Sequence, residues 1–327
     1  MPHNSNSPDL DPQDAWSSRN YKTRDDLLHM LNMLMEARAQ TDDWRYPHTG
    51  DLLFWFFMVL CHLNPTRHIR LWHAGGKLVG YAMLGEDPAF DCQVLPAHAW
   101  QGIEEEALSW AESLIGELCQ LDAKLWGGPI VSGARQDDLQ RRAFLEQHGF
   151  QVGGEFSEVN MIWLLEEPVP EASLPSGCQV RAVLDGNPDE ISNRSAAQRA
   201  VWQPWTVGNV TDEDYAQFMQ LPGYDRQLDI VAVAPDGVIA SYVNGWIDPL
   251  NKIGDFGPLG ALPAYRRQGL TQAVLLECAR RMQARGMNRI SVSTGVNNTP
   301  AIRLYESVGF KIVNQYLEYI KLSETSV

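Results

Sequence analysis

Apolar and polar positions in the second half of the chain alternate between strand-like and helix-like spacing. Two apolar stretches flank a Pro-Asp-Gly turn and predict paired strands. A third apolar strand then leads into a run with helical periodicity that ends at a glycine. The predicted order is strand, strand, strand, helix, strand, helix and strand, at residues 229–234, 238–247, 253–262, 270–286, 289–295, 299–309 and 315–322. This order predicts a mixed α/β unit.

The first half repeats the pattern in a weaker form. RLWHAGGKLVGYAML (70–84) matches the strand–turn–strand, with Gly-Gly in the turn. LPAHAWQGIEEEAL (95–108) aligns without gaps with LPAYRRQGLTQAVL (262–275), and FLEQHGFQV (144–152) aligns with LYESVGFKI (304–312). Three matches in the same order indicate two copies of one unit.

A proline-rich segment separates the two copies. LEEPVPEASLPSGCQ (165–179) contains three prolines, a glycine and small polar residues, which is typical of a linker. We expect a first domain at 1–168, a linker at 169–178 and a second domain at 179–327.

Composition narrows the range of functions. A chain of 327 residues is long enough for two domains. Its formal net charge of -15 argues against a general nucleic-acid or acidic-membrane binder. The charge is uneven: Lys+Arg against Asp+Glu is 12 against 25 in residues 1–170, and 14 against 16 in 171–327. A polyanionic ligand would therefore meet less repulsion in the second half.

The remaining sequence signals predict a cytoplasmic protein without a metal site. The five cysteines form no C-x-x-C pair, so neither a disulfide framework nor a zinc site is expected. The polar, acidic N-terminus does not resemble a signal peptide. The longest apolar run, at 52–63, is too short to span a bilayer, so we expect no membrane partner.

The segment LPAYRRQGLTQAVL (262–275) can form an anion-binding turn. A strand that passes directly into a helix leaves unpaired backbone N–H groups at the helix N-terminus, where the helix dipole also favours an anion. Gly269 permits a positive φ or close backbone approach. Arg266 and Arg267 carry charges able to grip phosphate oxygens. Alone, this pattern is more typical of a solvated basic loop.

Its context resembles the GNAT acetyltransferase superfamily, whose acyl-CoA-binding turn reads Q/R-x-x-G-x-G/A after an apolar strand. Here the turn runs from Arg266 to Thr271, with threonine where the family has glycine or alanine. A second block, NNTPAIRLYESVGF (297–310), resembles the family pattern N-x-x-A-x-x-L-Y-E-x-x-G-F. The resemblance is strong over 179–322 and weak in the first half. The tandem layout resembles that of mycothiol synthase and related two-copy GNAT proteins.

The resemblance implies an α/β (α+β) fold of two tandem GNAT-like domains, each a mixed, mostly antiparallel sheet flanked by helices. It also implies acetyl-CoA as co-substrate. The expected cofactor-binding residues are the strand end Gly260, Ala261 and Leu262 for the pantetheine arm, the turn Arg266, Arg267, Gln268, Gly269, Leu270 and Thr271 for the pyrophosphate, and Asn298 for the cofactor arm. Tyr305 lies where the family places a general acid near the thioester sulfur.

The reaction also needs a proton acceptor, because an amine of pKa ~10.4 is mostly protonated at neutral pH. All eight histidines lie in the first copy, so the second copy has no histidine base of its own. We expect Asp255 to accept the proton through a water or with a raised pKa. Asp248 is a weaker substitute, and a solvent-facing Asp255 remains an alternative.

Other aromatic residues of the second copy have two interpretations. Tyr305 fits either the catalytic acid or an ordinary packed aromatic. Trp202, Trp205, Tyr242 and Trp246 fit either an acceptor cleft or the core.

The first copy lacks the residues of the motif that are expected to bind phosphate or transfer a proton. Ala99 and Trp100 replace the two arginines, and a run of glutamates, 104–106, begins where the second copy has Thr271. Carboxylates at a helix N-terminus satisfy its dipole and repel a pyrophosphate. Leu145 aligns with Tyr305. We expect the first copy to be structural or a wall of the acceptor cleft, and its acidity to attract a cationic acceptor.

These patterns predict an N-acetyltransferase that transfers an acetyl group to a primary amine of a small molecule or peptide by direct attack in a ternary complex. The alternatives are a non-catalytic acyl-CoA sensor, which would need neither Tyr305 nor Asp255, and a purely structural pseudoenzyme.

Overall fold

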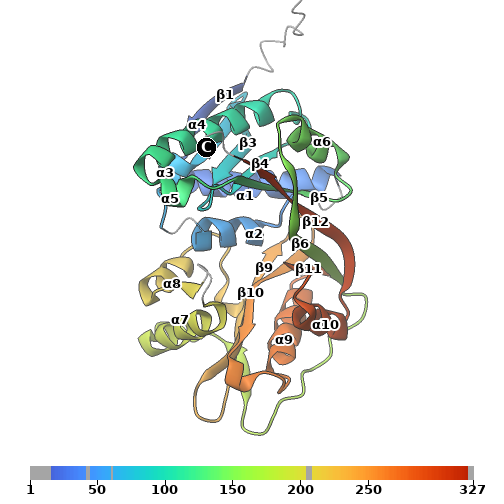
Figure 1. Ribbon diagram of the computed structural model, residues 1–327. Coiled ribbons are helices and arrows are strands. Elements are labelled where there is room, and N and C mark those ends of the chain that lie inside the picture. The colour runs from blue at the N-terminus through green and yellow to red at the C-terminus, as the bar shows by residue number, and fades with distance from the viewer. Residues whose placement is uncertain (1–15, 42–44, 60–61, 204–207, 323–327) are drawn as a thin grey trace, which may run out of the picture.

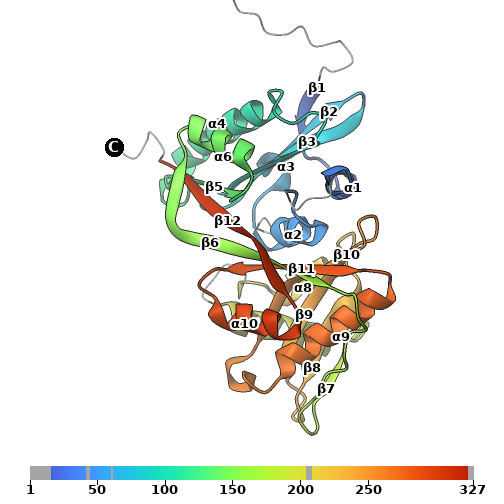
Figure 2. The same ribbon diagram turned by 90° about the vertical axis from the view of Figure 1, so that its right-hand side faces the viewer.

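The computed structural model describes residues 16–41, 45–59, 62–203 and 208–322 (Figures 1 and 2). The first half contains β1 (Trp16–Asn20), α1 (Arg24–Thr41), α2 (Thr49–Phe54), the π-helix Trp55–Val59, α3 (Pro65–His68), β2 (Ile69–Ala74), β3 (Lys77–Leu84), β4 (Phe90–Val94), α4 (Ile103–Leu121), α5 (Ala123–Trp126), β5 (Ile130–Arg135), α6 (Leu139–Gln147) and β6 (Gln151–Leu164).

The second half contains β7 (Gln179–Ala182), α7 (Pro188–Trp202), α8 (Asp212–Phe218), a 3-10 turn (Arg226–Leu228), β8 (Asp229–Val233), β9 (Ile239–Asp248), β10 (Ile253–Ala261), a 3-10 turn (Pro263–Tyr265), α9 (Leu270–Ala284), β11 (Arg289–Gly295), α10 (Thr299–Val308) and β12 (Lys311–Lys321). The elements predicted from periodicity in this half are confirmed, with bounds that differ by a few residues.

The strands form two mixed or antiparallel sheets flanked by helices, so the predicted fold class is confirmed. One sheet has the order β1-β2-β3-β4, and the other has the order β5-β12-β6-β11-β10-β9-β8-β7. In the larger sheet only β10 and β11 pair in parallel. An isolated parallel bridge between Ala89 and Val131 brings β4 next to β5.

The last strand of each half pairs with strands of the other half. Residues 158–164 of β6 pair with β11, and residues 316–321 of β12 pair with β5. Figure 2 shows β6 and β12 running together between the two halves of the molecule. The boundary at residue 168 stays a prediction, and these two strands cross between the regions it separates.

The two halves also share a hydrophobic core. Tyr215, Phe218 and Trp246 of the second half pack in one buried cluster with the core of the first half. A Cβ atom built on Gly50 of α2 would lie 2.5 Å from the Trp246 ring. The N-terminus of α2 therefore packs directly on β9.

Within the described part of the chain, no helix is long and apolar enough to cross a membrane. The described histidine, cysteine and acidic side chains form no group placed to hold a metal ion.

Candidate active site

The turn between β10 and α9 has a backbone suited to an anion. Arg267 has a φ of 63° and Gly269 a φ of 80°, both in the left-handed region. Left-handed residues within a turn direct successive N–H groups toward one concave side. Gly269 is the N-cap of α9 and no side chain caps the helix there. The first N–H groups of α9 thus remain available to a ligand.

Some side chains around this turn form hydrogen bonds with its backbone and stabilise it. Arg266 Nε donates to the Ala261 carbonyl at 3.2 Å, and Gln268 Nε2 donates to Ala264 at 3.2 Å. Ser241 Oγ donates to the Gly260 carbonyl at 2.8 Å and lies 3.3 Å from Thr271 Oγ1. Thr271, the departure from the family pattern, is therefore placed against β9.

The strand that enters the turn separates from its parallel neighbour. β10 pairs with β11 only over Ile253–Asp255, and its register against β9 shifts between Phe256 and Leu259. Beyond Asp255, no described strand pairs with the edge of β10 that faces β11. A Cβ atom on Gly260 would lie 2.3 Å from Val201 of α7, so this strand end is packed tightly on its α7 face. An extended ligand can pair with the open edge.

Asp255 is buried on the face of β10 that α2 covers. It is 4% exposed and accepts a hydrogen bond from Ser291 Oγ at 2.5 Å. The solvent-facing alternative is therefore wrong. Burial raises the pKa of Asp255 well above its usual range, and the nearby Asp51 of α2 raises that pKa further. The sequence predicts two ways in which Asp255 serves as proton acceptor, and a raised pKa is one of them.

Tyr305 lies on the other face of the sheet. It is 5% exposed, belongs to the same buried cluster as Phe256, and packs on Phe310 with ring centroids 5.5 Å apart. Burial raises the pKa of its hydroxyl, and the charge of Asp255 adds to that shift. The charge of Asp255 therefore affects the pKa of Tyr305 from the opposite face of the sheet, where β10 and β11 separate.

Two other predicted polar residues have structural partners. Asn298 is the N-cap of α10, where its Oδ1 accepts from the Ala301 N–H at 3.4 Å and its Nδ2 donates to Thr294 Oγ1 at 3.1 Å. Its contact with a cofactor stays a prediction. Asp248 is fully buried and accepts from Asn251, with Arg38 Nε at 3.9 Å.

The aromatic residues divide between core and partial burial. Tyr242 and Trp246 are 0% and 2% exposed and belong to the core. Trp202 is partly buried against the cluster that contains Tyr242. Trp205 lies outside the described residues.

The family comparison matches the part of the chain that contains this turn. The model of the acetyltransferase (GNAT) family matches residues 195–310. The chain is 24% identical over 293 residues to a mycothiol acetyltransferase of Thermobispora bispora, an alignment that covers 85% of this chain and 90% of the relative. The chain is a two-domain GNAT protein.

Further relatives are consistent with this assignment. Mycothiol acetyltransferase of Arthrobacter is 26% identical to this GNAT protein over 164 residues, about half of each chain (47% and 50%). A tandem GNAT protein from the clavulanic acid biosynthesis pathway superposes with a TM-score of 0.64 at 14% identity, covering 96% of this chain and 100% of that one. A GCN5-related N-acetyltransferase from Sphaerobacter thermophilus has a TM-score of 0.61 at 20% identity, with 94% and 95% covered. The GNAT protein is an acetyltransferase.

Sequence reasoning missed two neighbours of Asp255. Ser291 lies across from it in β11, and Asp51 comes from α2, some 200 residues earlier in the chain. The paired strands of the GNAT unit could have suggested Ser291. Asp51 carries no motif, because its role depends on how the first copy packs on the second.

Proposed function

We propose that the second copy of this GNAT protein transfers the acetyl group of acetyl-CoA to the amine of a small-molecule acceptor. The observation that carries the proposal is the turn after β10, where left-handed Arg267 and Gly269 open the uncapped N-terminus of α9. Such a terminus is a ready anion site, and the pyrophosphate of CoA is a matching anion.

The residues around the turn fit the rest of the co-substrate. The unpaired edge of β10 at 260–262 can hydrogen-bond with the amides of the pantetheine arm. Exposed Arg266 and Arg267 supply positive charge for the phosphates. The thioester would then lie near the point where β10 leaves β11, between Asp255 and Tyr305.

The chemistry is a direct acyl transfer. The acceptor nitrogen attacks the thioester carbonyl, a C–N bond forms, and the C–S bond breaks. Asp255 takes the ammonium proton, directly or through one water, and its raised pKa makes its carboxylate a better base than an ordinary aspartate. Tyr305 gives its hydroxyl proton to the departing thiolate, and the hydroxyl is protonated at neutral pH, as in an ordinary tyrosine, because burial raises its pKa and does not lower it.

The acceptor is a primary amine of a small molecule. The relatives described above are mycothiol acetyltransferases, so the cysteinyl aminosugar that such an enzyme would require is the first amine of the screen. Aminosugars and peptide N-termini follow. A cytoplasmic location stays a prediction.

The first test separates binding from catalysis. Wild type should bind acetyl-CoA in a calorimeter and Gly269→Glu should not, because a carboxylate would then stand at the anion site. Absence of binding to wild type would refute the proposal.

The second test measures release of free thiol from acetyl-CoA over the amine panel. Tyr305→Phe and Asp255→Asn should each lose at least ten-fold in kcat, since each removes a proton-transfer group. Tyr319→Phe is a matched control, because this buried tyrosine donates to Glu146 in the first half at 2.9 Å. Full activity in Tyr305→Phe would remove the acid from the mechanism.

A further inference from the structure

The first copy keeps the backbone of the anion-binding turn although it has lost the arginines. Trp100 has a φ of 62° and Gly102 a φ of 116°, matching Arg267 and Gly269 in the aligned positions. Gly102 is the N-cap of α4, and no side chain caps the helix at that residue. The turn in the first copy is therefore shaped to receive an anion.

A carboxylate of the same chain occupies this turn. The Trp100 N–H donates to Glu104 Oε1 at 2.9 Å. Glu104 lies in the first turn of α4 and is only 6% exposed. Burial raises its pKa and the hydrogen bond from Trp100 opposes that rise. Thr271, the aligned residue in the second copy, brings no charge to the corresponding turn.

An arginine occupies the gap between the strands that separate in the first copy. The described β4 and β5 belong to different sheets, and an isolated bridge between Ala89 and Val131 joins the two regions where they begin. Arg141 of α6 joins the two strands: its Nε donates to the Gly133 carbonyl of β5 at 2.7 Å, and its Nη1 donates to the Cys92 carbonyl of β4 at 2.8 Å. Arg141 Nη2 also donates to Asp91 Oδ1 at 3.0 Å.

The matching position in the second copy carries no arginine that could join the two strands. Ala301 aligns with Arg141 and has no group that could bridge β10 and β11. Carbonyls on the inner edges of such strands are the groups that a pantetheine amide would otherwise contact. In the first copy, Arg141 thus donates to the strand carbonyls with which an extended ligand would form hydrogen bonds in the second copy.

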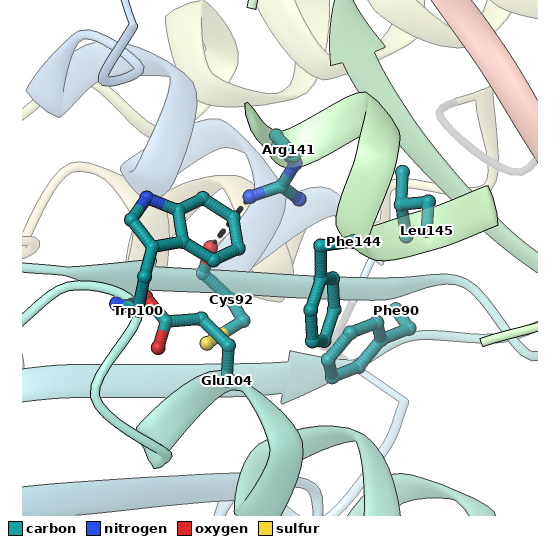
Figure 3. Close-up of a pocket in the computed structure, with 7 residues that line it drawn as sticks. All are labelled: Phe90, Cys92, Trp100, Glu104, Arg141, Phe144 and Leu145. Carbon is teal, nitrogen blue, oxygen red and sulfur yellow. Dashed lines mark hydrogen bonds between the residues drawn. The ribbon is translucent and has the colours of Figure 1, made fainter. Parts of the chain in front are cut away.

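Large side chains fill the space between Glu104 and Arg141 (Figure 3). The Trp100 and Phe144 ring centroids are 5.5 Å apart. Leu145 stands where the second copy has Tyr305. The small cavity that remains is lined by Phe90, Cys92, Trp100, Glu104, Arg141, Phe144 and Leu145.

We propose that the first copy holds a built-in substitute for its co-substrate, in which Glu104 takes the place of the pyrophosphate and Arg141 that of the pantetheine arm. The chain therefore binds one acetyl-CoA, in the second copy. The inference rests on the proposed function, because it takes the second turn as the acetyl-CoA site.

Calorimetry on the full-length chain tests the stoichiometry. Wild type should bind one acetyl-CoA per chain, and Gly269→Glu should bind none. A stoichiometry of two overturns the inference, as does binding that survives Gly269→Glu and disappears when Gly102→Glu is added. A single site removed by Gly102→Glu alone would lie in the first copy and would overturn both the inference and the proposed function. No binding to wild type refutes the proposed function instead.

A second experiment opens the first copy. In the Gly269→Glu chain, Glu104→Thr with Arg141→Ala reproduces the residues of the second copy and should restore measurable acetyl-CoA binding. The control pair, Glu105→Thr with Arg142→Ala, changes the neighbouring charges and should restore none. A folded double variant that still binds nothing shows that these two side chains do not exclude the co-substrate. The stoichiometry test needs no substitution in the first copy, so it decides even where the double variant fails to fold.

Discussion

Replacing Arg267 with glycine should make the protein more stable and its acetyl-CoA affinity weaker. Arg267 has a φ of 63°, a conformation that costs an L-residue roughly 1–2 kcal/mol. Glycine removes that cost but adds roughly 0.5–1 kcal/mol of conformational entropy to be lost on folding. We therefore expect the free energy of unfolding to rise by about 0.5–1 kcal/mol.

The affinity should change in the opposite direction. The Arg267 side chain is exposed beside the anion-binding turn. A hydrogen bond to a charged group contributes roughly 1.5–3 kcal/mol, so losing it should raise the Kd for acetyl-CoA by about ten- to 150-fold. Urea denaturation measures the first change and calorimetry the second. Arg267→Ala keeps the strained φ and should show the affinity loss without the stability gain.

Lys252 provides a matched control for backbone strain. It is exposed and has a φ of 53° in the turn between β9 and β10. Lys252→Gly should show a similar stability gain with an unchanged Kd. If Arg267→Gly binds acetyl-CoA as tightly as wild type, the backbone amides alone hold the phosphates and the role given to the arginine is wrong.

Two further substitutions probe buried charges. Arg194 is fully buried and donates to Asp229 at 3.2 Å and to Asn244 at 2.5 Å. Arg194→Ala leaves the buried Asp229 carboxylate without its cation, so it should lower the free energy of unfolding, measured in urea, by roughly 3–5 kcal/mol. Asp51→Asn removes a carboxylate that raises the pKa of Asp255, so the acid limb of the kcat/KM profile should move to lower pH.

Each of these substitutions has a control with the same change in charge at the surface. Arg280→Ala breaks an exposed pair with Glu277 and should cost at most about 1 kcal/mol. Glu105→Gln should leave the pH profile in place. A cost below 1 kcal/mol for Arg194→Ala contradicts the importance of its buried pair. If the acid limb of the profile does not move in Asp51→Asn, measured with the same amine, then Asp51 does not raise the pKa of the catalytic base.

Local chemistry was readable in the sequence, and long-range packing was not. The turn at Gly269 and the helices α9 and α10 follow from glycine placement and helical periodicity, which depend only on near neighbours. The sequence around Arg141 is typical of the exposed face of a helix, and nothing in it indicates that Arg141 donates to the carbonyls of two strands. Trp246 fitted a cleft as well as a core, because its burial depends on α2 from the other copy.

Strand partners were equally out of reach. Alternation of apolar residues predicts that β6 and β12 are strands, but it does not specify which edge each one joins. The insertion of β6 between β11 and β12 is set by the shape of both halves together.

The exchanged strands affect how the chain is made. β5 (Ile130–Arg135) pairs with β12 (Lys311–Lys321), which follows every other described strand of the second half. During synthesis from the N-terminus, β5 therefore has no β12 partner until the second copy has been made. Until then its unpaired edge can attract other strands. A first half made without the second would keep that edge of β5 exposed.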